Sequence, residues 1–383
     1  MPSARSASPY HMTEMIEAEP WLSERILNRL AAPDGSAARL AATLRTAAAA
    51  GRPVIVVGCG TSEHGAIAVA EILRDANRAA GLPSSLGEGG SPIAVQAFEG
   101  GLEPVLGGPG AVVIGVSHEG GTAATYRAMS LARDSGATVA LVTAALGSPA
   151  AEIADIVIST EEMDQSWCHT VGYLSPILAA TAVGAHLASW QFPASSVRLL
   201  LETGLSTPSR NAQANMATKL AGVSRLLVLG SGVDRAAARE LTLKVEEGAQ
   251  LPAAMRDLET MLHGHLAGTD STTGVVVFLT DASARGARTA RALGVMRACR
   301  EIGIQVGLIA STVTAGEVDV DLTPAGRILV PDDAAMPASV AGLIGTAVPL
   351  QCLTEQLAIR RGKNPDPIRR DDPRYLAAAE AAG

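Results

Sequence analysis

The chain has 383 residues, of which 48% are hydrophobic and 18% are charged, and its formal net charge is −8. This balance excludes a disordered chain, and the length fits two domains of ordinary size. Acidic residues outnumber basic ones, 38 against 30, and no basic stripe occurs, so the sequence predicts no nucleic-acid partner.

Small aliphatic side chains dominate the sequence, because aromatic residues make up only 3% of it. Such a core is typical of helices packed on parallel strands, so we expect an α/β fold. The cysteines lie far apart without paired spacing, which argues against a zinc cluster or a disulfide framework. The start has no apolar signal segment, and we expect no run of about 18 apolar residues free of charge. The sequence therefore predicts a cytoplasmic protein with no membrane partner.

The first half begins with a helical pattern and continues with alternating strands and helices. Apolar residues at helical spacing predict a helix over 13–30, within an N-terminal helical segment at 1–45. An apolar run at 53–58 ends in a glycine turn and leads into a helical stretch at 61–80, which indicates a buried parallel strand feeding a helix. More strands and a closing alanine-rich helix complete a first domain over 46–200. These are strands 111–117, 137–143 and 155–159 and helix 171–190.

The same order of elements returns in the second half. A strand at 225–230 precedes a helix over about 234–250, and the strands of the two halves match at offsets of about 163 to 172 residues. The remaining strands are 274–280, 304–310 and 327–331. We therefore expect a tandem repeat of two three-layer α/β domains, the second over 201–361. The proline-containing tail, 362–383, is expected to run extended over the surface or into a cleft.

Two glycine turns follow predicted strands and carry hydroxyl side chains. In the first turn, Gly60, Thr61 and Ser62 come where a strand end meets a helix start, and free backbone N–H groups at such a place favour an anion. The alternative is a plain glycine turn with a hydroxyl at the helix N-cap. Glu63 stands where a dinucleotide-binding fingerprint needs glycine, and no P-loop lysine follows.

The second turn follows the next predicted strand and holds five candidate ligand-binding residues. They are Ser117, His118, Glu119, Gly120 and Thr122. Two glycines open backbone N–H groups to a ligand, and Thr122 caps the next helix. The two turns follow adjacent strand ends, where they are placed to grip one ligand. The alternative is a solvated loop tip formed by His118 and Glu119.

The pair of turns, Gly-Cys-Gly-Thr-Ser and Ser-x-x-Gly-x-Thr, resembles the sugar isomerase (SIS) domain family. The resemblance covers about 320 residues and matches the arrangement of two SIS domains in tandem. It implies that the two turns hold the phosphate of a small phosphosugar. The apolar helix at 171–190 further suggests a homodimer that shares its active sites.

A second motif resembles the isomerase half of glucosamine-6-phosphate synthase. Lys244 and Glu247 lie at i and i+3 of one helix, and His263 follows Glu247 by sixteen residues. The resemblance implies that Glu247 moves the proton between C1 and C2 and that His263 of the neighbouring subunit assists ring opening, with Lys244 as a charge partner. From spacing alone, Glu240, Lys244 and Glu247 also fit a surface ion-pair ladder. His263 and His265 have no third ligand at suitable spacing, so no metal site is expected.

Three features depart from the synthase. The sequence starts directly with the helix before the first SIS copy, so we expect no glutamine amidotransferase domain and no glutamine-driven amino transfer. Ala378 stands where the synthase tail has a lysine, so Schiff-base chemistry from the tail is not expected. Glu119 replaces a serine of the phosphate turn, and a carboxylate beside a phosphate is unfavourable unless it points away or pairs with His118. We expect Glu119 to point away and the substrate to be a 6-phosphate sugar.

The polar segment after the strand at 155–159 resembles the E-x-S-x-x-x-T segment of SIS deaminases and deglycases. This resemblance makes Ser166 and Thr170 candidate sugar contacts, and the alternative is that they cap the helix beginning near Val171. The sequence thus predicts a sugar-phosphate isomerase that works through an enediol intermediate without a cofactor. An amino-sugar-phosphate deaminase or fructosamine-phosphate deglycase is an alternative, and so is a phosphosugar-binding regulator without catalysis.

Overall fold

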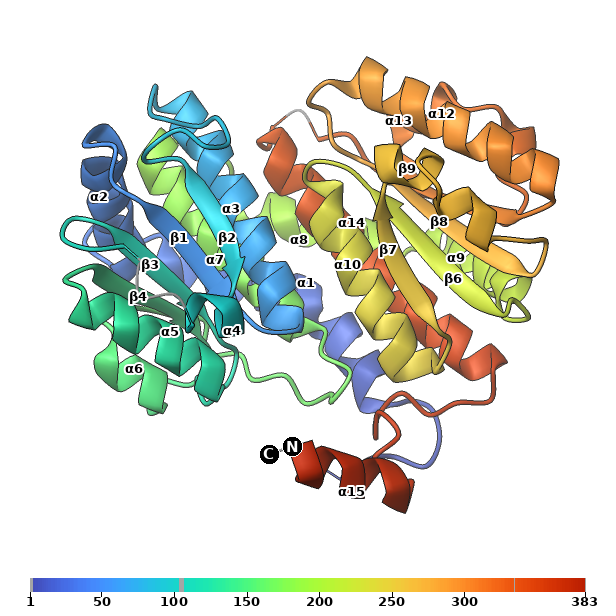
Figure 1. Cartoon of the computed structure of the whole chain (residues 1–383), viewed down its shortest axis with the longest axis horizontal. Helices are drawn as coiled ribbons and strands as arrows, with labels where there is room; N and C mark the ends of the chain where they lie inside the picture. Colours follow the sequence, from blue (N-terminus) through green and yellow to red (C-terminus); the bar gives the residue numbers. More distant parts are fainter. Residues whose placement is uncertain (1–2, 103–106, 334, 383) are drawn as a thin grey trace.

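The computed structural model describes residues 3–102, 107–333 and 335–382. Within these residues, two parallel five-stranded sheets stand side by side, each with helices on both faces (Figure 1). The predicted α/β class is confirmed, with two tandem domains that are each three-layer sandwiches around a parallel sheet.

The first sheet has the strand order β2-β1-β3-β4-β5. Its strands are β1 (Val54–Gly58), β2 (Pro92–Gln96), β3 (Val112–Val116), β4 (Thr138–Thr143) and β5 (Ile156–Ser159). Every residue of β1 and β3 is buried, because helices cover both faces of these apolar strands. One face packs against α5 (Ala123–Asp134) and α6 (Pro149–Ile153). The other face packs against α3 (Thr61–Ala79) and α7 (Val171–Ala188).

The second sheet has the order β10-β9-β8-β6-β7, so its strands follow the same connectivity as those of the first. They are β6 (Arg225–Gly230), β7 (Ala253–Asp257), β8 (Thr273–Leu279), β9 (Gln305–Ser311) and β10 (Gly326–Val330). One face packs against α11 (Leu258–Leu262) and α12 (Arg285–Ile302), and the other against α10 (Asp234–Lys244) and α14 (Ala338–Arg360). The edge strands β2 and β7 were not predicted, because their residues are mostly half-buried and the apolar stretch in each is short and ends in polar or charged residues.

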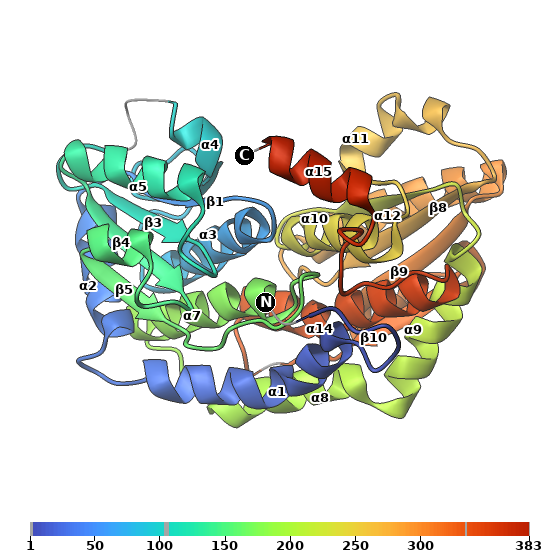
Figure 2. The same ribbon diagram turned by 90° about the horizontal axis from the view of Figure 1, so that it is seen from below.

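One hydrophobic core runs through both domains, because the facing helices of the two sheets pack on each other. Helix α1 (His11–Leu30) crosses beneath this core from α7 to α14 (Figure 2). Helix α8 (Ala194–Leu205) also packs on α14 and spans residue 200, where we placed the domain boundary. The remaining α-helices are α2 (Ser36–Ala49), α4 (Ala97–Gly100), α9 (Thr207–Leu220), α13 (Thr312–Gly316) and α15 (Pro373–Ala382).

The expectation of a fully extended tail is wrong, because its last part forms helix α15 below both sheets (Figure 1). Pro373 suits the first turn of a helix, and the Asp372 carboxylate accepts a hydrogen bond from the N–H of Arg374 at 3.0 Å. Alanine-rich sequence then continues the helix. Residue 383 lies outside the described residues.

The expectation that no long apolar run free of charge exists is also wrong. Helix α7 has 18 residues and is apolar enough to cross a membrane by length and composition alone. However, 83% of this segment is buried inside the protein, between the first sheet and the helices α1 and α3. A helix that is apolar all round fits the interior of a large domain.

Candidate functional site

A cleft of about 260 Å³ opens at the carboxyl ends of β1 and β3. Parallel α/β sheets bind their ligands at this edge. The two glycine turns, the segment before α7, the turn directly after α10 and the tail all contribute to its walls. The lining residues are Cys59, Thr61, Ser62, His118, Glu119, Thr122, Trp167, His169, Glu247, Ile368 and Arg370.

The first glycine turn presents Thr61 and Ser62 to the cleft. Gly58 must lack a side chain, because a Cβ there would lie 2.2 Å from the carbonyl oxygen of Ser62. Gly60 has φ 55° and ψ −129°, a conformation that glycine adopts without strain, and it does not itself line the cleft. The N–H of Ser62 donates to the carbonyl of Cys59 at 3.0 Å, so Ser62 offers the cleft its hydroxyl rather than its backbone.

The second glycine turn presents His118, Glu119 and Thr122 to the cleft, so Glu119 lines the site rather than pointing away from it as expected. Ser117 and Gly120 form the buried underside of this turn and do not line the cleft. The N–H of Gly120 donates to the carbonyl of Ser117 at 3.1 Å, so it is not free for an anion. The hydroxyls of Thr61, Ser62 and Thr122 therefore belong to residues that line the cleft, whereas the N–H groups of Ser62 and Gly120 are already used inside the protein.

His118 is held as a neutral imidazole with a defined tautomer. Its Nε2 accepts a hydrogen bond from the backbone N–H of Asp164 at 2.9 Å, so the ring proton lies on Nδ1. Nδ1 is buried and has no hydrogen-bond partner in the described part of the chain. Burial lowers the pKa of His118 below its usual 6.5, although the nearby Asp164 carboxylate opposes this. The ring stands edge-on to that of His169, with 5.5 Å between centroids.

The candidates Ser166 and Thr170 lie outside the cleft and are fully buried. The Asp164 carboxylate accepts hydrogen bonds from the N–H groups of Ser166, Thr170 and Gly172 at 2.9, 2.6 and 3.0 Å. The segment therefore caps the first turn of α7, as the alternative to sugar binding proposed. The acceptor, however, is the Asp164 carboxylate and not the hydroxyls of Ser166 and Thr170. Two other residues of the same segment, Trp167 and His169, line the cleft instead.

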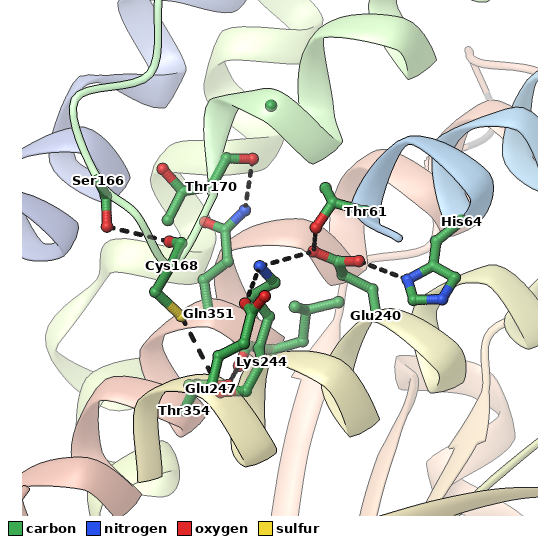
Figure 3. A network of polar contacts seen from close by, with 12 residues as sticks. Thr61, His64, Ser166, Cys168, Thr170, Glu240, Lys244, Glu247, Gln351 and Thr354 are labelled. Atoms are coloured by element: carbon green, nitrogen blue, oxygen red, sulfur yellow. Dashed lines mark hydrogen bonds and ion pairs between the residues drawn. The ribbon is translucent and has the colours of Figure 1, made fainter. Parts of the chain in front are cut away.

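Glu247 enters the cleft from the second domain. It lies in a single π-helical turn, Val245–Ala249, directly after α10, and such turns are frequent at functional sites. The Nζ of Lys244 lies 2.5 Å from its Oε2, and Lys244 itself is completely buried. Lys244 therefore does not face a ligand but fixes the carboxylate that does (Figure 3).

A buried chain of polar contacts continues from Lys244 into the first domain (Figure 3). Lys244 lies 3.7 Å from Glu240, whose other oxygen lies 2.7 Å from Nδ1 of His64 on α3. Burial would raise the pKa of Glu240, but Lys244 and His64 lower it below the usual value. Burial would lower the pKa of Lys244, but Glu247 and Glu240 raise it. Since Glu240 and Lys244 are fully buried, the alternative of a surface ladder is wrong.

His263 does not line the cleft of its own chain. It lies after α11, its side chain is 70% exposed, and its Nε2 lies 2.7 Å from Oε1 of Glu259. The neighbouring His265 accepts a hydrogen bond from Arg256 at 3.2 Å. The role of His263 in the site of a neighbouring subunit therefore stays a prediction.

Five lining residues were not among the sequence candidates: Cys59, Trp167, His169, Ile368 and Arg370. The polar segment that suggested Ser166 also contains Trp167 and His169, so that signal pointed to the right place. Arg370 gave no local signal, because it reaches the cleft through the fold of the tail. Its guanidinium lies 3.9 Å from the centre of the Trp167 ring.

Comparisons with known proteins bear on the fold of the chain. No family model matches the chain. Over 344 residues, 88% of the chain, it is 25% identical to the glutamine–fructose-6-phosphate aminotransferase (isomerizing) of Pyrobaculum aerophilum. The match spans about half, 52%, of that relative's length.

Solved structures match the fold over nearly the whole chain. The C-terminal domain of glucosamine-fructose-6-phosphate aminotransferase from Francisella tularensis has a TM-score of 0.78 at 16% identity, covering 95% of this chain and 99% of that one. Tagatose-6-phosphate ketose/aldose isomerase from Escherichia coli has a TM-score of 0.74 at 19% identity, and the match covers 96% of this chain and 97% of that one. Glucosamine-6-phosphate deaminase from Thermotoga maritima has a TM-score of 0.67 at 16% identity, and the match covers 93% of this chain and 97% of that one. The resemblance to proteins built from two SIS domains is confirmed.

Proposed function

We propose that this chain, a relative of the double-SIS proteins, moves a proton between C1 and C2 of a sugar phosphate through an enediol intermediate. One observation carries the proposal. The Glu247 carboxylate of the second domain lies in the same cleft as the hydroxyls of Thr61, Ser62 and Thr122 of the first. A base and a set of ligand-binding groups thus meet at the edge where α/β sheets bind ligands.

Glu247 is suited to act as the base. A general base must be held within hydrogen-bond reach of the proton that it removes. Lys244 restrains one carboxylate oxygen, while about a quarter of the side chain, 24%, remains exposed to the cleft. A carboxylate that is fixed on one side and open on the other can take a proton from C2 and return it to C1 without moving its backbone.

Deamination or deglycation is the second candidate, because it uses the same base and differs in whether an amine leaves the sugar. The likeness of the fold to that of a glucosamine-6-phosphate deaminase supports this second candidate. A regulator that binds a phosphosugar without turning it over is a third reading. It would retain the hydroxyls of the cleft but would have no use for the restrained Glu247.

We also propose a cytoplasmic homodimer with shared active sites, in which His263 of one subunit assists ring opening in the cleft of the other. His263 is exposed and outside its own cleft, as such a role requires. Mixing Glu247→Gln subunits with His263→Ala subunits should restore about a quarter of the wild-type activity, because mixed dimers hold one intact site. Mixtures as inactive as their parents, or a monomer mass in light scattering, would contradict the sharing.

The central test compares Glu247→Gln with Glu246→Gln. Glu246 is the adjacent carboxylate, is exposed, and does not line the cleft, so it is a matched control. With a panel of 6-phospho sugars in heavy water, Glu247→Gln should slow substrate proton exchange by about 100-fold to 10,000-fold while binding persists. Glu246→Gln should exchange as the wild type does. Exchange that survives in Glu247→Gln removes Glu247 as the base.

A coupled ammonia assay on the same panel separates the candidates. Aldose–ketose conversion without ammonia identifies an isomerase, and ammonia release identifies a deaminase. Binding that stabilises the protein against heat, without either product from any sugar, identifies a regulator.

A further inference from the structure

The charges that line the cleft do not match a phosphate ester unless the tail is included. Glu119 and Glu247 are both carboxylates, and Arg370 is the one permanent cation among the described lining residues. Lys244 lies behind Glu247, and its charge is already shared between Glu247 and Glu240. A phosphate ester brings about two further negative charges at neutral pH, so Glu119 would repel it without a nearby cation.

Arg370 is held where it can supply that cation. Its guanidinium stacks on the Trp167 ring at 3.9 Å, which stabilises the group through a cation–π interaction. Stacking occupies the face of the guanidinium and leaves its edge, with five N–H donors, for a ligand. Within the residues that the structure describes, the side chain of Arg370 makes no hydrogen bond or ion pair to another protein group.

The tail that carries Arg370 is anchored just before the cleft. The Asp366 carboxylate is buried and accepts hydrogen bonds from the N–H groups of Arg5, His11 and Met12 at 3.2, 3.1 and 3.3 Å. Ile368 has φ 41°, a left-handed conformation that is strained for a β-branched residue. The anchor and this turn together direct the chain so that Ile368 and Arg370 line the cleft.

We propose that Arg370 binds the phosphate of the substrate and determines specificity by offsetting the charge of Glu119. The inference rests on the proposed function, because it takes the ligand to be a sugar phosphate. Arg370 contacts the ligand only through its guanidinium edge and takes no part in the proton transfer. Glu119 and Arg370 together then determine how much negative charge the site accepts on its ligand.

The test uses Arg370→Gln and the matched control Arg369→Gln, in the full chain. Arg369 is the adjacent arginine, stacks on Tyr375 at 4.0 Å, and does not line the cleft. We would measure binding of fructose 6-phosphate, of the other 6-phospho sugars of the panel, and of their dephosphorylated forms by calorimetry at two salt concentrations. Arg370→Gln should weaken binding of the phosphorylated sugar about 10-fold to 100-fold and leave the dephosphorylated sugar unchanged. Arg369→Gln should bind both as the wild type does, and Glu119→Gln should tighten the phosphorylated sugar alone.

The outcomes separate this inference from the proposed function. Equal binding by Arg370→Gln and Arg369→Gln, with turnover intact in the wild type, overturns the role of Arg370 and leaves the function standing. Loss of phosphate preference in Arg370→Gln, without turnover in the wild type, supports Arg370 and overturns the enzyme. A wild type that binds none of the phosphorylated sugars overturns both. Arg370 lies at the surface of the tail, so unchanged thermal unfolding of its variant serves as the folding check.

Discussion

Nδ1 of His64 lies 2.7 Å from Oε2 of Glu240, and this buried contact joins α3 of the first domain to α10 of the second. Through Glu240 and Lys244 it continues to Glu247, the proposed base. The position of the base therefore depends on the packing of both domains. This chain of contacts also makes the interface costly to disturb, because Glu240 and Lys244 are fully buried and rely on their neighbours.

Glu240→Gln tests how far the fold depends on this chain. The change leaves Lys244 buried with one carboxylate fewer, and we expect a loss of about 3–5 kcal/mol in the free energy of unfolding. The control is Glu63→Gln, which removes the partly exposed pair of Glu63 and Arg239 at 3.1 Å between the same two helices. That change should cost less than about 1 kcal/mol. Urea unfolding measures both, and equal losses would contradict the prediction.

Asp234, at the start of α10, should make stability fall as pH rises. Burial raises its pKa from 3.8 to about 6, against hydrogen bonds from Thr280 and from the N–H of Asp281 that lower it. Between pH 3.8 and about 6, Asp234 keeps its proton in the folded protein, whereas the unfolded chain has lost it. The contribution of this proton to the free energy of unfolding is therefore complete below pH 3.8 and is lost above about pH 6. It amounts to about 3 kcal/mol.

The substitution Asp234→Asn isolates this contribution. The amide oxygen can accept the N–H groups of Thr280 and Asp281, and the amide nitrogen can donate to the Thr280 hydroxyl, as a protonated acid would. Unfolding followed from pH 4 to 7 should show the wild type losing stability relative to the variant. Parallel curves for the two proteins would refute the raised pKa.

His118 should be neutral at pH 6.5 with its proton on Nδ1. Burial lowers its pKa, and Nε2 is occupied by the N–H of Asp164. Nitrogen chemical shifts of the imidazole, assigned by comparison with His118→Gln, report both the charge and the tautomer. A protonated ring at pH 6.5, or a proton on Nε2, would show that this turn is built differently.

Substitution by alanine should destabilise the protein strongly at Gly58 and hardly at Gly121. At Gly58 a Cβ would lie 2.2 Å from the backbone oxygen of Ser62, whereas at Gly121 no atom lies within 4 Å. Gly58→Ala should therefore lower the free energy of unfolding by more than about 4 kcal/mol, and Gly121→Ala by less than about 0.5 kcal/mol. Thermal unfolding distinguishes the two, and a well-folded Gly58→Ala would contradict the close approach at this turn.

The sequence was most informative where local pattern decides structure. Buried strands such as β1 and β3 are continuous apolar runs, so they could be predicted along with the glycine turns that follow them. The edge strands β2 and β7 were missed, because they are half-buried and the apolar stretch in each is short. The helical end of the tail escaped as well, because the prolines before it suggested an extended chain throughout.

Site residues followed the same rule. Thr61, Ser62, Thr122 and Glu247 reach the cleft as their positions after strands or on a helix face predicted. The burial of Ser166 and Thr170 was not predictable, because it depends on Asp164 turning the chain inward. Arg370 could not be found from spacing, since a contact between a tail and the turn before α7 is set by the tertiary fold alone.

The anchoring of the tail by Asp366 links ligand binding to residues that lie far apart in the sequence. The carboxylate accepts hydrogen bonds from the N–H groups of His11 and Met12 at the start of α1, and Ile368 and Arg370, a few residues further on, line the cleft. A substitution of Asp366, or a shift of the start of α1, would therefore displace one wall of the cleft without changing any residue that lines it.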